Sequence, residues 1–95
     1  MMQSQTLIET GQASKYLQQL CKHFAHKTEV TFSETEAHCV FGTATADMRA
    51  KEQGLEVIIT AEDPEGIDRG QMVIWKHLER FAFREDLSEP VWQTA

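Results

Sequence analysis

Two histidines occupy matching positions in the sequence and are the residues best placed to do chemistry. Each follows a lysine, in the segments Leu20-Cys21-Lys22-His23-Phe24 and Ile74-Trp75-Lys76-His77-Leu78. At about 100° per residue, each histidine falls at the flank of a helical apolar stripe. If two helices place these flanks face to face, the imidazoles share a site for a carboxylate, a phosphate or a metal with Tyr16, Lys27 and Arg80. A histidine in this position is also an ordinary boundary residue that forms hydrogen bonds, and this alternative stays open.

Metal binding has weaker support than anion binding. Because Cys21 and His23 are separated by one residue, their side chains diverge by about 160° on a helix. His23 and His26 are better spaced, but no carboxylate lies nearby in the sequence to complete a ligand set. Lys22 and Lys27 would also repel a metal cation. We therefore expect no metal and no cofactor.

Nucleophilic catalysis has little support in the sequence. Cys21 falls on an apolar stripe and Cys39 in a predicted strand, so both are expected to be packed, inert thiols. The chain contains no glycine-rich phosphate loop, serine nucleophile elbow or paired-carboxylate arrangement. We expect no catalytic residues. Whether the protein is an enzyme stays open, and a non-catalytic role is favoured.

Formal charge is distributed unevenly along a chain whose net charge is −6. Residues 12–27 sum to +3 and residues 66–84 to +2, whereas the rest of the chain sums to −11. A basic helical layer of this kind suits an anionic ligand or a protein partner. The same pattern also arises when lysine and arginine simply solvate helices and their C-terminal turns. The negative net charge argues against bulk nucleic-acid binding.

The apolar spacing predicts the elements that position these residues. Residues 5–9 are expected to form a strand, and Thr10 to cap a helix over residues 13–27. In this helix the apolar residues are separated by alternating steps of three and one, at Ala13, Tyr16, Leu17, Leu20, Cys21, Phe24 and Ala25. Asp63 and Pro64 begin a second helix that fades near residue 83 or 84. Its stripe consists of Ile67, Gly70, Gln71, Ile74, Trp75, Leu78, Phe81 and Ala82.

Alternating apolar residues predict strands between the two helices, over residues 30–33, 38–51 and 55–61. Gly42 marks a bulge or bend within the long strand, and residues 52–54 close a hairpin. The element order is β-α-β-β-β-α, or β-α-β-β-β-β-α if Gly42 splits the long strand. We therefore predict one α+β domain over residues 1–95, a two-layer sandwich with a mostly antiparallel sheet and both helices on one face. After Pro90 ends any further helix, Trp92 is expected to fold back onto this body.

Composition is typical of a small globular domain. Of the 95 residues, 41% are hydrophobic and 25% charged, which allows a thin core. Dimerisation would bury more surface but is not required by the sequence. The N-terminal residues resemble no signal peptide, and no apolar run is long enough to cross a membrane. We expect a cytoplasmic protein with reduced cysteines and no membrane partner.

Two segments resemble a known family. They are Tyr16-Leu-Gln-Gln-Leu-Cys-Lys-His-Phe-Ala-His-Lys27 and His77-Leu-Glu-Arg-Phe-Ala-Phe-Arg-Glu85. With the strands between them, they resemble the bacterial family known as domain of unknown function 2218, over most of the chain. The resemblance implies no enzymatic activity, and the family pattern falls on Tyr16, Lys22, His23, Lys27, His77, Arg80 and Phe83. Some members occur with, or fused to, siderophore-interacting flavoproteins, which implies a role near iron acquisition and such a flavoprotein as a partner.

The sequence leaves three hypotheses about function. The leading hypothesis is a small binding or accessory module, possessing a basic helical face that contacts a small anionic ligand or a protein partner through Tyr16, Lys22, His23, Lys27, His77 and Arg80. The second is a homodimeric structural protein without a ligand site, with Phe83 at the interface. The third is a small enzyme or metal-binding protein that uses His23 and His77. A short distance between these two histidines would support a shared site.

Overall fold

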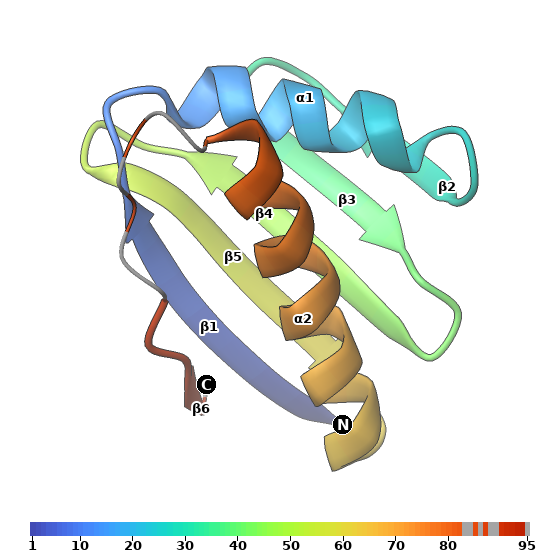
Figure 1. Ribbon diagram of the computed structural model, residues 1–95. Coiled ribbons are helices and arrows are strands. Elements are labelled where there is room, and N and C mark those ends of the chain that lie inside the picture. The colour runs from blue at the N-terminus through green and yellow to red at the C-terminus, as the bar shows by residue number, and fades with distance from the viewer. Residues whose placement is uncertain (83–84, 86, 88–89, 95) are drawn as a thin grey trace.

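The protein folds as one antiparallel sheet covered on one face by two helices (Figure 1). The computed structural model describes residues 1–82, 85, 87 and 90–94. Its elements are β1 (Met2–Glu9), α1 (Ala13–Phe24), β2 (Glu29–Phe32), β3 (Glu36–Val40), β4 (Ala44–Ala50), β5 (Gly54–Ala61), α2 (Pro64–Phe81) and β6 (Gln93–Thr94). The predicted α+β class, with both helices on one face, is confirmed.

The six strands follow the order β2-β3-β4-β5-β1-β6. Three hairpins join β2 to β5, and β1 returns beside β5 through an eight-residue antiparallel ladder. Gly42 adopts a φ of +73° in the turn between β3 and β4, so it splits the predicted long strand and gives the alternative order with one more strand. The short strand β6 was not predicted, because a two-residue bridge leaves no periodic signal.

Of the two predicted N-caps, the one of α2 is confirmed and the one of α1 is wrong. Asp63 caps α2 as expected, accepting a 2.8 Å hydrogen bond from the Gly66 backbone N–H. The predicted Thr10 cap of α1 is wrong, because Gln12 occupies the N-cap position. The Thr10 hydroxyl instead accepts from the Gln12 N–H at 3.1 Å, forming a local turn just before the helix.

The C-terminal end of α1 also differs from the prediction. The helix ends at Phe24 rather than at Lys27. The Phe24 carbonyl accepts hydrogen bonds from the backbone N–H groups of Lys27 and Thr28 and from the Thr28 hydroxyl. These bonds satisfy the helix end early, because Glu29 must already be extended to pair with Val40 of β3.

The core lies between the helices and the covered face of the sheet. The predicted α1 stripe is confirmed up to Phe24, and α2 buries Gly70, Ile74 and Leu78 along its own stripe. A Cβ at Gly70 would lie 2.6 Å from Ile59 Cγ2, so glycine allows α2 to approach β5 closely. The fully buried side chains include Leu17, Leu20, Met48, Leu55, Ile59, Ile74 and Leu78.

The two cysteines meet inside this core. Cys21 of α1 and Cys39 of β3 are both free and fully buried, and their Sγ atoms are 4.0 Å apart. The hydrogen bond with Cys21, together with burial, raises the pKa of the Cys39 thiol. A buried thiol that resists ionisation is a poor nucleophile, which agrees with the packing role predicted for Cys39. The same hydrogen bond lowers the pKa of Cys21, and the burial of this thiol opposes that change. Neither α1 nor α2 is long and apolar enough to cross a membrane, considering the described residues.

Candidate anion-binding site

His23 and His77 lie against each other where the two helices meet. Their ring centroids are 4.7 Å apart and the ring planes are tilted by 48°. The helices are not antiparallel neighbours, since α2 runs obliquely across the sheet and its C-terminal end approaches α1 (Figure 1). His23 comes from the last turn of α1, and His77 lies one turn before the end of α2. The crossing of the two helices therefore brings both imidazoles to one location.

The backbone fixes which nitrogen of His77 can serve a ligand. His77 Nδ1 lies 2.8 Å from the Val73 carbonyl oxygen, and a carbonyl only accepts hydrogen bonds. The proton of the neutral ring is therefore assigned to Nδ1, which leaves Nε2 as the free nitrogen. His77 is partly buried, whereas His23 is exposed. The pair thus combines one oriented imidazole with one accessible imidazole.

Aromatic rings hold the two histidines in place. Phe24 packs edge-on against His77 with centroids 5.1 Å apart, and it also contacts Phe41 at 5.0 Å. Phe81 packs against His23 at 5.9 Å, again at a steep angle. Edge-to-face contacts of this kind restrict ring rotation and exclude water from part of each ring. The site is consequently supported by the core on one side and open to solvent on the other.

The electrostatic surroundings of the pair are basic. Partial desolvation lowers the pKa of His23, and the nearby His77, Lys27, His26 and Arg80 lower it further. The groups that act on His23 are therefore all cationic or neutral bases. The last turns of α1 and α2 also meet here, and their partial negative charge attracts cations. The helix dipoles therefore account for basic residues here without a ligand. Their negative ends also offset part of the positive charge.

Tyr16 and Lys22 are the other two residues predicted to bind the ligand. Tyr16 is 4% exposed, and its hydroxyl donates a 2.7 Å hydrogen bond to Glu85 Oε1. Burial, together with this bond, raises the pKa of Tyr16 to about 12. Tyr16 thus anchors the chain that follows α2, and its hydroxyl is already occupied. Lys22 is exposed on α1 but is not among the groups that lower the pKa of His23. The predicted interface residue Phe83 lies outside the described residues.

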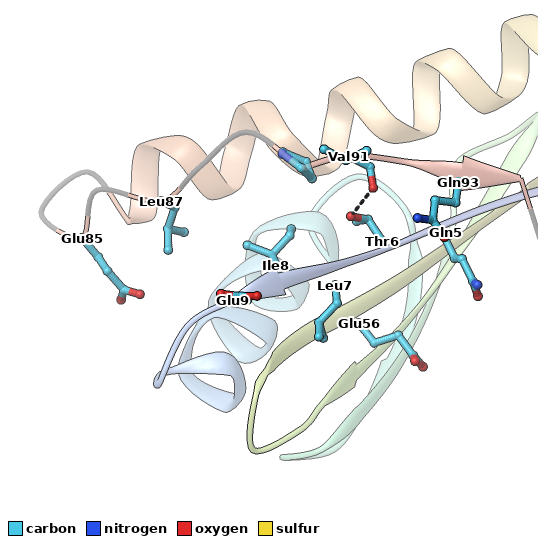
Figure 2. A pocket seen from close by; sticks show the side chains of 11 residues that line it. Gln5, Thr6, Leu7, Ile8, Glu9, Glu56, Glu85, Leu87, Val91 and Gln93 are labelled. Carbon is cyan, nitrogen blue, oxygen red and sulfur yellow. Dashed lines mark hydrogen bonds between the residues drawn. The ribbon is translucent and has the colours of Figure 1, made fainter.

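The larger hollows of the surface lie elsewhere. One of about 760 Å³ borders β1 and the C-terminal segment, where the Thr6 hydroxyl donates a 2.9 Å hydrogen bond to the Val91 carbonyl (Figure 2). Another, of about 690 Å³, lies over the open face of the sheet. Neither hollow includes His23 or His77. His23 is exposed and His77 partly buried, so the pair is a surface site, which suits a small ion better than an enclosed organic molecule.

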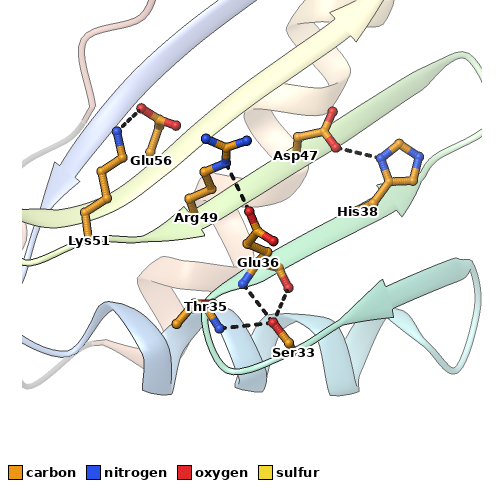
Figure 3. A network of polar contacts seen from close by, with 8 residues as sticks. All are labelled: Ser33, Thr35, Glu36, His38, Asp47, Arg49, Lys51 and Glu56. Carbon is orange, nitrogen blue, oxygen red and sulfur yellow. Dashed lines mark hydrogen bonds and ion pairs between the residues drawn. The ribbon is translucent and has the colours of Figure 1, made fainter.

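Sequence reasoning missed a polar network on the open face of the sheet (Figure 3). His38 Nδ1 lies 2.7 Å from Asp47 Oδ1, and Arg49 lies 3.5 Å from Glu36. The register of the β3–β4 hairpin around Gly42 places the two members of each pair opposite each other. A turn placed at Gly42 would have predicted this register from the sequence. The side chains of both pairs are about half exposed or more. Each pair therefore contributes only about 0–1 kcal/mol to stability.

Metal ligation has no support among the described residues. Within residues 1–82, 85, 87 and 90–94, no group of three or more histidine, cysteine, aspartate or glutamate side chains could hold a metal ion. His23 and His77 supply two nitrogens without a carboxylate or thiolate partner in that part of the chain. The donor set of the pair does not fit a structural zinc site, which takes four ligands.

Comparisons with known proteins place the chain in a family. The solution NMR structure of PA4090 from Pseudomonas aeruginosa is similar over 98% of this chain and 96% of that chain, with 31% sequence identity and a TM-score of 0.82. No curated protein matches the sequence. The profile of a family described as an uncharacterised protein conserved in bacteria matches residues 5–93. The resemblance noted in the two helical segments is thereby confirmed: the chain belongs to the bacterial family known as domain of unknown function 2218.

Proposed function

We propose that the protein is a non-catalytic binding module that holds a small anionic ligand at the His23–His77 pair. The observation that carries this proposal is the 4.7 Å separation of the two rings. Lys27 and Arg80 lie close enough to influence His23 and would supply permanent positive charge at the rim. An imidazole or imidazolium N–H together with these cations offers the charge-assisted hydrogen bonds that phosphate and carboxylate groups accept.

The expected affinity follows from the exposure of the site. A unit charge pair at 4 Å contributes about 1 kcal/mol in water and about 4 kcal/mol at an effective dielectric constant of 20. His23 and Arg80 are exposed, so values near the lower figure apply. Lys27 and Arg80 at about 1 kcal/mol each, with two imidazole hydrogen bonds of about the same size, give about 4 kcal/mol, which corresponds to a dissociation constant of about 1 mM. A ligand that spreads several carboxylates over the pair would bind more tightly.

The proposal is tested by titrating phosphate, citrate and a ferric–citrate chelate while recording imidazole NMR shifts. His23 and His77 should shift together, with His38 on the open sheet face as an internal control that does not move. The titration with the ferric–citrate chelate tests the link to iron that the family resemblance implies, because this ligand differs from citrate only by the metal. Shifts that involve neither His23 nor His77, with any of the ligands, contradict the proposal.

A matched pair of variants separates a specific site from general attraction. Arg80→Ala removes a cation beside His23, whereas Lys15→Ala removes one from the first turn of α1, near Glu85. Both change the net charge by the same amount. We expect Arg80→Ala to weaken citrate binding about fivefold or more, since 1 kcal/mol is worth roughly that factor. Equal weakening in the two variants would indicate non-specific attraction instead.

A further inference from the structure

We propose that the His23–His77 site takes a dianionic oxyanion, such as sulfate or a phosphate group, together with protons from solvent. This inference rests on the proposed function and adds the class of ligand and the control of its binding. Without an anion, partial desolvation and the nearby cations Lys27 and Arg80 disfavour a proton on His23. A bound dianion reverses that preference, because imidazolium then faces negative charge.

The separation of the rings argues for this coupling. Two imidazolium groups with ring centroids 4.7 Å apart repel each other, so an anion beside them is needed before both rings can carry a charge. From α1 and the turn that follows it, His26 and Lys27 face His23, and from α2 Arg80 does so. Each of these groups opposes a proton on His23. The C-terminal dipoles of both helices favour protonation but carry only about half a charge each.

The sheet beneath the pair offers no counter-charge among the described contacts. The turn between β3 and β4 contributes the uncharged Phe41 ring, which packs on Phe24. The anion itself must therefore supply the negative charge that two imidazolium rings require.

The proton balance of the binding step is simple. The Val73 carbonyl already accepts a hydrogen bond from His77 Nδ1, so the added proton goes to Nε2, which then donates to an oxygen of the ligand. His23 takes its proton in the same way at whichever nitrogen faces the anion. Only N–H bonds form, and the protons come from water or buffer. A compact dianion balances two imidazolium charges, whereas a monocarboxylate balances one.

Calorimetric titration with sulfate tests the inference, because sulfate keeps its two charges across the relevant pH range. Measurements at a pH of about 5.5 and about 7.5, at constant ionic strength, cover the ordinary range of histidine titration. We expect affinity to fall about tenfold to a hundredfold between them, because an average uptake of about half a proton to one proton over two pH units gives a change of that size. Repeating the titration in buffers of different ionisation enthalpy should show uptake of about half a proton to one proton per sulfate.

Two variants and a second anion sharpen the result. His77→Gln should reduce the pH dependence by about half, because His23 still takes its proton, while His38→Gln on the open sheet face should keep it in full. Because His77 is partly buried, His23→Gln at an exposed position repeats the test if the first variant does not fold. Acetate should bind about tenfold more weakly than sulfate at the lower pH, since one lost charge contact of about 1.4 kcal/mol is worth that factor.

The outcomes separate the two proposals. Sulfate that binds equally at both pH values without proton uptake overturns this inference and leaves the proposed function standing. Sulfate that fails to bind at either pH overturns both. At the higher pH, where a phosphate monoester carries two charges, a monoester that binds as tightly as sulfate supports the inference with a phosphorylated molecule as ligand. A monoester that binds tenfold more weakly supports it with the free inorganic anion.

Discussion

Replacing Tyr16 by phenylalanine tests whether this residue anchors the C-terminal segment. The substitution removes only the hydroxyl that donates a 2.7 Å hydrogen bond to Glu85 Oε1. Hydroxyls of Thr10 and Tyr16 lower the pKa of Glu85, which identifies its carboxylate as the charged acceptor. The Tyr16 ring is buried and keeps its packing in the variant. Any change in stability therefore reports the hydrogen bond itself.

The expected magnitude is modest because one partner is partly exposed. A hydrogen bond to a charged group contributes about 1.5–3 kcal/mol to stability. Glu85 is only partly buried, so water replaces part of the lost bond and the lower end applies. A loss of about 1–1.5 kcal/mol lowers the Tm of a domain of this size by about 4–12 °C. The histidine NMR signals should remain unchanged, since Tyr16 is not part of the pair.

Thermal unfolding at two pH values provides the assay. The pKa of Glu85 is lowered in the folded protein, so its stabilisation is present above the usual carboxyl pKa and is lost as pH falls through the lowered value. The difference between wild type and Tyr16→Phe should accordingly be full at neutral pH and shrink in acid. Glu85→Gln as a second background completes a double-mutant cycle. A Tm unchanged at neutral pH would refute the anchor and free the Tyr16 hydroxyl for a ligand.

Four further outcomes follow from single contacts. Asp63→Ala removes the side-chain cap of α2 and should cost about 0.5–2 kcal/mol, measured by urea unfolding. Gly70→Ala forces a Cβ against Ile59, so despite better helix propensity it should destabilise by about 1 kcal/mol in the same assay. Asp47→Asn, on the open sheet face, should change the unfolding free energy by less than about 0.5 kcal/mol. The pKa of His23 is lowered on folding, so the protein should lose stability as pH falls below the usual histidine pKa. His23→Gln should flatten that decline, and an unchanged slope would contradict this origin.

Much of the fold was predictable because local rules and tertiary packing agree. The stripe that contains Leu17, Leu20 and Phe24 has an unbroken helical period, and those residues are buried as expected. Asp63 followed by Pro64 is a strong start signal, and α2 begins there. These signals lie within a few residues of one another. They therefore do not depend on how distant segments pair.

Features that depend on distant pairing were harder to predict. The meeting of His23 and His77 depends on α2 crossing the sheet obliquely, which no local spacing specifies. The role of Tyr16 depends on Glu85, a partner 69 residues away in the sequence. The early end of α1 reflects the need of Glu29 to enter the sheet. In each case the deciding contact joins segments that the sequence separates.

The competing explanation of the basic site is also physical. Arg80 lies in the last turn of α2 and Lys27 just beyond the end of α1, where the helix dipoles stabilise cations without any ligand. On that view the histidines are ordinary boundary residues, and His77 simply satisfies the Val73 carbonyl. The two views differ in what they predict for added anions, since a solvated helix end has no preference for a dianion.

Imidazole NMR shifts during a sulfate titration at a pH of about 6 decide between them most directly. A ligand site predicts that His23 and His77 shift together and saturate with one dissociation constant, while His38 stays unchanged. It also predicts that sulfate raises the pH at which His23 titrates, because the bound anion favours the protonated ring. Histidine signals that drift equally and without saturation would contradict an anion site at this pair.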